Sequence, residues 1–155
     1  MTTALEDISA RIASINGDVI GISRSYEHPP LTVSTADLPC MASRFVSVPG
    51  DIAIGETKAS FYDFELWVVG TPLAQGLDPS DHVDALLPFV SAVRDQYASR
   101  MHLNSSAGAA LLSGIVSVAG LGNVRNDPVQ IGDTWYPCFK FQLRVKHIES
   151  VTVAG

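Results

Sequence analysis

The residue types most often used for chemistry are spread far apart along this 155-residue chain. A histidine metal site usually needs two imidazoles on one element, as in the spacings HxH or HExxH. Here the nearest two histidines are 20 positions apart, and none of the four lies in such a motif: His28, His82, His102 and His147. The sequence therefore predicts neither a histidine metal site nor a histidine catalytic centre.

The two cysteines lie in apolar surroundings. Cys40 precedes Met41, and Cys138 lies between Pro137 and Phe139. A nucleophilic cysteine needs a polar setting and a nearby base, and two distant cysteines are too few for a disulfide framework or a zinc knuckle. We expect both cysteines to be small packing residues.

Two further patterns have ordinary explanations. Gly120-Leu121-Gly122 follows an apolar run, as a dinucleotide-binding turn does, but the third glycine and the immediate helix of that motif are missing. Asp63 and Glu65 share one strand face, which is common without any glycosidase function. We expect no catalytic residue, no cofactor and no metal, and therefore a protein that is not an enzyme.

The composition excludes several classes of protein. Apolar residues make up 46% of the chain and charged residues 17%, unlike a disordered protein. The formal net charge of −6 argues against binding nucleic acid by broad phosphate neutralisation. No apolar run approaches the length of about 18 residues that a membrane span needs, and the first residues lack the pattern of a secretion signal. We expect one intracellular domain over residues 1–155, with some of its charge-poor surface buried against partners.

Two segments have the periodicity of amphipathic helices. In the first, apolar residues recur at steps of three and four, and Asn16-Gly17 is expected to stop the helix in a left-handed conformation: Leu5, Ile8, Ile12 and Ile15. The second starts at Asp78-Pro79, a typical helix start, and keeps its apolar spacing from Val83 to Met101 with Pro88 as an interruption.

Four segments are typical of strands, namely Cys40–Val48, Phe61–Val69, Ser113–Ala119 and Trp135–Ile148, with a long connection over Gly120–Gly132. Residues 50–58 lie between turn signals and are expected to form a projecting loop or hairpin, the arm, whose Ile52 and Ile54 contact a neighbour. The sequence predicts an α+β fold: an antiparallel sheet of about four strands with two main helices packed on one face.

The two clearest strands each have one apolar face and one charged face. In the last strand Phe139, Phe141, Leu143 and Val145 alternate with Lys140, Arg144 and Lys146, so we expect the first set in the core. Asp63, Glu65 and Trp67 share the charged face of the earlier strand. Either the opposite charges pair across neighbouring strands of one subunit, or they meet between subunits with an exposed Trp67 as an anchor.

The segments follow one another in a specific order. The N-terminal helix is followed by Asp37-Leu38-Pro39, the aromatic strand Phe61–Val69, a helix of the type Leu-Leu-Pro-Phe-Val-x-x-Val (Leu86–Val93), a strand of small residues, and a final segment Gly-Asp-x-Trp-Tyr-Pro-Cys-x-Phe-x-Phe-x-Leu-x-Val (Gly132–Val145). This order resembles the tail terminator (tail completion, or neck) proteins of long-tailed bacteriophages. The stretch from Asp18 to Ala36 departs most from that pattern, because it is longer and more polar.

This resemblance implies a structural virion protein that is assembled in the host cytoplasm. Its copies would form a ring, hexameric in the family, at the head-proximal end of the tail tube, contacting the tube protein and head–tail connector proteins while DNA passes through the lumen. The residues leave open another head–tail connector subunit, or a small α+β enzyme or ligand-binding domain with an apolar pocket.

Overall fold

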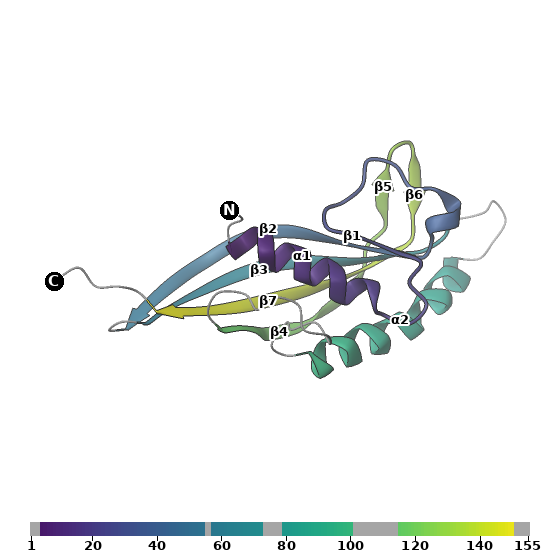
Figure 1. Ribbon diagram of the computed structural model, residues 1–155. Coiled ribbons are helices and arrows are strands. Elements are labelled where there is room, and N and C mark those ends of the chain that lie inside the picture. Colours follow the sequence, from purple (N-terminus) through teal and green to yellow (C-terminus); the bar gives the residue numbers. More distant parts are fainter. Residues whose placement is uncertain (1–3, 55–56, 73–78, 101–114, 151–155) are drawn as a thin grey trace.

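The computed structural model describes residues 4–54, 57–72, 79–100 and 115–150. Asp78, Met101 and His102 lie outside the described residues, as do the side chains of His82 and Ile54. Within these described ranges, two helices and seven strands follow one another (Figure 1): α1 (Ala4–Gly17), β1 (Arg24–Tyr26), the 3-10 turn η1 (Thr35–Asp37), β2 (Cys40–Ile54), β3 (Thr57–Val69), α2 (Pro79–Ser99), β4 (Ile115–Asn126), β5 (Val129–Ile131), β6 (Thr134–Tyr136) and β7 (Cys138–Ser150).

The main sheet has five strands in the order β1-β2-β3-β7-β4. The α+β class is thereby confirmed, but the sheet is mixed, because β1 runs parallel to β2 while all other neighbours are antiparallel. The expectation of a purely antiparallel sheet is wrong for this edge. The chain between β1 and β2 turns back on itself through Pro29-Pro30 and η1, so that both strands run in the same direction.

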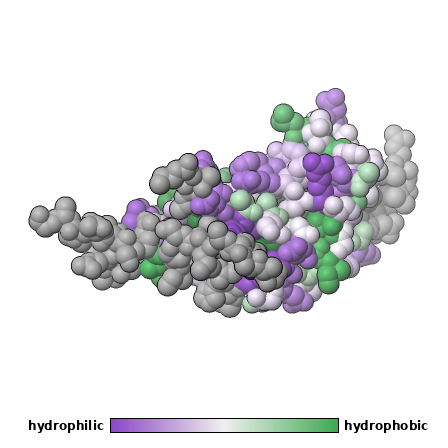
Figure 2. Space-filling view, viewed as in Figure 1, coloured by the Kyte–Doolittle hydropathy of each residue, from purple (hydrophilic) through white to green (hydrophobic). Residues whose placement is uncertain are grey.

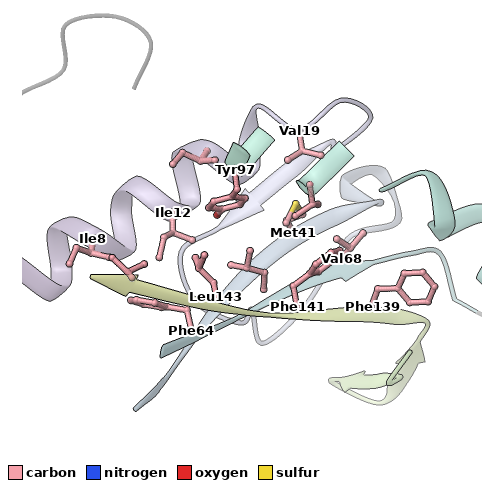
Figure 3. Close-up of a cluster of buried hydrophobic side chains, with 14 of the residues drawn as sticks. Ile8, Ile12, Val19, Met41, Phe64, Val68, Tyr97, Phe139, Phe141 and Leu143 are labelled. Carbon is pink, nitrogen blue, oxygen red and sulfur yellow. The ribbon is translucent and has the colours of Figure 1, made fainter. Parts of the chain in front are cut away.

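The helices and one face of the sheet share a hydrophobic core. Ile8, Ile12 and Ile15 of α1 are buried, and so are Val93 and Tyr97 of α2. Figure 3 shows Ile8, Ile12 and Tyr97 of the helices facing the strands. The strand residues of the same cluster include Phe64, Leu66 and Val68 of β3 and Phe139, Phe141, Leu143 and Val145 of β7. The predicted core of the last strand is confirmed, since these four β7 residues are buried while Lys140, Arg144 and Lys146, which alternate with them, are not.

A buried hydrogen bond joins the two helices. The Tyr97 hydroxyl of α2 donates to Oδ1 of Asn16 in α1 over 2.7 Å, although the two residues are 81 positions apart. Burial raises the pKa of the Tyr97 hydroxyl far above its ordinary value, so this group stays protonated. Asn16 thus fixes α2 rather than capping α1, and the left-handed glycine comes later, at Gly21 with φ of 91°, and not at Gly17 as expected.

A second hydrophobic cluster covers the opposite face of the sheet at one end. The β5–β6 hairpin turns at Gly132, where φ is 63°, and packs over the ends of β2, β3 and β7 (Figure 1). The buried members of this second cluster are Leu38, Cys40, Val69, Val129, Ile131, Tyr136 and Cys138. Two expectations are corrected here: the last strand is split at Pro137 into β6 and β7, and the expected connection after residue 120 is largely strand, because β4 continues to Asn126.

Residues 50–54 and 57–58 are the far end of the long β2–β3 hairpin. Ile52 pairs with Ala59 on β3, and Ala59 in turn pairs with Ile148 on β7. In Figure 1 these three strands extend together beyond the N-terminal end of α1. The arm is therefore the continuation of a three-stranded sheet, not a separate short loop.

Candidate functional site

Six of the predicted site residues share the sheet face opposite the helices, called the outer face from here on: Asp63, Glu65, Trp67, Lys140, Arg144 and Lys146. Ile52 lies apart from them at the far end of the β2–β3 hairpin. In the β3–β7 register, Asp63 lies opposite Arg144, and Trp67 lies opposite Lys140. Lys146 lies opposite Phe61, with its Nζ 5.9 Å from the ring centroid. Of the two interpretations of the opposed charges, the structure shows the pairing across neighbouring strands within one subunit.

Asp63 and Arg144 form a two-point ion pair. Arg144 donates from Nε to Oδ1 over 2.8 Å and from its terminal nitrogen to Oδ2 over 3.0 Å. This contact raises the pKa of the Arg144 guanidinium above its ordinary value. Both oxygens of Asp63 are occupied by donors, so this carboxylate is held as a structural acceptor.

Glu65 is the buried charge of the outer face, with 5% of its surface exposed. Its carboxylate accepts hydrogen bonds from Trp67 Nε1 over 2.7 Å and from Arg125 over 2.8 Å. Arg44 on β2 adds an ion pair of 3.6 Å. Burying a carboxylate is costly unless it is paired and hydrogen-bonded, and these three partners satisfy that condition.

Trp67 and Lys140 belong to the same network. Trp67 is half-buried against the second cluster, and the Lys140 ammonium lies 5.1 Å from its ring centroid. Lys140 also donates to Asp127 over 2.8 Å, with only 13% of its side chain exposed. An interface anchor requires an exposed Trp67. That expectation is corrected here, because the indole packs and hydrogen-bonds within its own subunit.

We expect Lys140→Met to raise the pKa of Asp127. The hydrogen bond and charge of Lys140 hold the pKa of this carboxyl below its ordinary value, with a smaller contribution from Arg125. The contact therefore persists above the pKa that Asp127 has in the folded protein and is lost as the pH falls through it. A carbon-detected NMR titration of Asp127 measures the shift, and Lys58→Met, which removes the partner of Asp51, is the control. An unchanged Asp127 titration would show that Lys140 does not set this pKa.

A shallow cavity of about 530 Å³ lies over the middle of the outer face. Its lining includes Asp63, Glu65 and Arg144, together with Val46 of β2 and the β4 segment that contains Gly120 and Gly122. Each charged group in this lining is bound to an oppositely charged neighbour. The cavity can admit a small molecule, but its carboxylates are engaged as acceptors instead of being held ready as bases.

Other chemical candidates are limited. Within the described ranges, no three residues among His, Cys, Asp and Glu form a cluster able to hold a metal ion. Cys40 and Cys138 are free thiols packed in the second cluster, and burial raises their pKa values to about 11 and about 12. This confirms both cysteines as packing residues. None of the described helices is long and apolar enough to cross a membrane.

The long edge of β2 is open. β1 pairs only with Cys40–Ala42, and no other described strand pairs with residues 44–54 on that side. This stretch, the open edge, contains Pro49 and four apolar side chains that are 40–54% exposed: Phe45, Val46, Val48 and Ile52. Sequence reasoning found Ile52, but it placed the first three inside an ordinary strand. By contrast, the hydrophobic areas visible in Figure 2 are small and separate.

Comparisons with known proteins add no assignment to this geometry. No protein-family model matches the chain, and no curated protein is significantly similar to it.

Proposed function

We propose that this chain is a structural virion protein whose copies form a hexameric ring at the head-proximal end of a phage tail tube. The ring ends tube polymerisation and provides the head-docking surface, while DNA passes through its lumen without sequence-specific binding. Its partners are further copies of itself, the tail tube protein and the head–tail connector proteins. Assembly takes place in the host cytoplasm.

The observation that carries the proposal is the open edge of β2. An unpaired strand edge offers a row of backbone donors and acceptors to another chain, and monomeric proteins usually blunt such edges. Here the edge is interrupted at Pro49 but still carries exposed Phe45, Val46, Val48 and Ile52 on both sides of the proline. A protein that works as one member of a ring needs such a surface, because each subunit must bind a neighbour on two different sides.

The arm fits the same proposal. Its strands extend beyond α1, and Ile52 is exposed there between Asp51 and Ala53, which are also exposed. We assign this end of the hairpin to contacts with the neighbouring subunit or with the tube. The outer-face residues Asp63 and Arg144 are not needed for this contact, because they pair with each other within the subunit.

One observation favours a second candidate, a ligand-binding domain. The outer-face cavity has the volume of a small-molecule site, within the usual range of roughly 300–1,000 Å³. Its charged groups, however, satisfy one another and leave no convergent polar set for a ligand. The ring is therefore the better-supported function.

The decisive measurement is the mass of the protein in solution as a function of its concentration. We expect light scattering to give six times the subunit mass of 16.5 kDa, and negative-stain images to show rings with a central hole. Incubation with purified tail tubes lacking a terminator should place the protein at one tube end. A protein that stays monomeric at every concentration and does not bind tube ends would contradict the proposal.

A further inference from the structure

We infer that the open edge of β2 in one subunit pairs antiparallel with β4 of the next subunit, and that its Phe45 side chain enters a notch between β4 and α2 of that subunit. This inference rests on the self-assembly in the proposed function, but it does not depend on the phage setting. It names the two surfaces that meet.

Strand direction supports this pairing. The four long strands β2, β3, β7 and β4 alternate in direction, so β4 runs opposite to β2. A second copy placed beside the first in the same orientation therefore brings its β2 antiparallel to β4. The sheet then continues without a break in its alternation, and the helices of both copies lie on the same side of it.

The receiving side carries a mostly apolar notch. A cavity of about 390 Å³ lies between α2 and β4, and Arg94 is the one charged residue in its lining; the others are Tyr97, Ala98, Val118, Ala119, Gly120 and Leu121. On the donating side, Phe45 lies on the helix-facing side of β2, opposite Phe64, with the two ring centroids 5.8 Å apart. In the continued sheet, Phe45 thus lies on the same side as the notch.

Two glycines lie in the part of β4 that would meet the second strand. Gly120 and Gly122 have open space above the sheet where a side chain would begin. Glycine within a strand often marks a place where another backbone comes close. β4 is the last strand of the sheet among the residues described, as β2 is beyond Ala42.

Pairing between two β2 edges is the competing arrangement. It would bury the same apolar side chains but would leave the notch empty, and it would give a closed twofold dimer in place of a ring. The complementarity of an apolar edge and an apolar notch on opposite sides of one subunit favours the head-to-tail arrangement.

The test uses one variant on each surface. Val48→Asp places a charge on the open edge, and Ala119→Glu places one at the notch; both residues are exposed in the subunit. Each variant alone is expected to weaken self-association at least about tenfold, because a carboxylate without a partner is costly to bury. Leu31→Asp, at another exposed apolar residue, is the matched control and should assemble like the parent.

Mixing the variants separates the arrangements. Val48→Asp keeps an intact notch and Ala119→Glu keeps an intact open edge, so an equimolar mixture should form heterodimers by native mass spectrometry while each variant alone stays monomeric. Dimers of Ala119→Glu alone would indicate paired β2 edges and overturn the inference. Rings formed by both single variants would overturn it while leaving the proposed ring intact, whereas a parent that never self-associates would contradict the ring itself.

Circular dichroism and unfolding midpoints verify folding, and Ile52→Asp replaces Val48→Asp if that variant is destabilised.

Discussion

Phe141→Ala is expected to lower the free energy of unfolding by about 3–5 kcal/mol. Phe141 has no exposed surface and lies opposite Leu66 in the middle of the sheet, facing the core between the strands and the helices. Replacing its ring by a methyl group removes buried apolar surface and leaves a cavity that the close-packed neighbours can fill only in part.

Urea denaturation followed by circular dichroism measures this loss. Gln142→Ala is the control, because Gln142 is the next residue along β7 and is exposed on the outer face. It should change stability by less than about 0.5 kcal/mol. Equal losses of stability for the two variants would mean that Phe141 and Gln142 do not lie on opposite, buried and exposed, faces of β7.

Asn16→Ala is expected to cost about 1–3 kcal/mol, even though it removes a polar side chain from the core. Asn16 and Tyr97 are both buried, and the amide oxygen accepts the hydrogen bond of the tyrosine hydroxyl over 2.7 Å. Without Asn16 the hydroxyl stays buried without this acceptor. Because Tyr97 remains protonated, the loss should be independent of pH across the neutral range.

Combining Asn16→Ala with Tyr97→Phe tests the reason for this loss. If the cost comes from leaving the Tyr97 hydroxyl without its acceptor, the two losses of unfolding free energy should not add. The double variant should then be more stable than the sum of the two single losses predicts, which a double-mutant cycle measures. Strict additivity of the two losses would show that the hydrogen bond does not couple the helices. Ser99→Ala, at the exposed end of α2, is the control.

The parts of the fold that could be predicted from the sequence are the elements whose apolar residues recur with a strict local period. The alternation from Phe139 to Val145 assigns a core face because a slip by one residue would exchange the two faces. The spacing of Ile8, Ile12 and Ile15 assigns the buried side of α1 in the same way. In both elements the side chains alone determine which face is buried.

The missed parts depend on partners far away in sequence. Gly120-Leu121-Gly122 has the composition of a loop, yet it is strand because β7 pairs with it and Leu121 packs on the core. The burial of Glu65 depends on Arg125, 60 positions further along the chain. Arg44, the only charge in an otherwise apolar strand run, was the available signal for a buried carboxylate beside it.

Pro49 limits what the open edge of β2 can do. It has no N–H to donate, and it lies where the β2–β3 register shifts, between Ser47 and Gly50. The open edge is thus divided into two short runs, each too brief to template a long cross-β stack. A proline and irregular register on an exposed strand are typical guards against fibril growth. The subunit can therefore expose an apolar strand edge for one finite contact and still resist open-ended aggregation before it binds its neighbour.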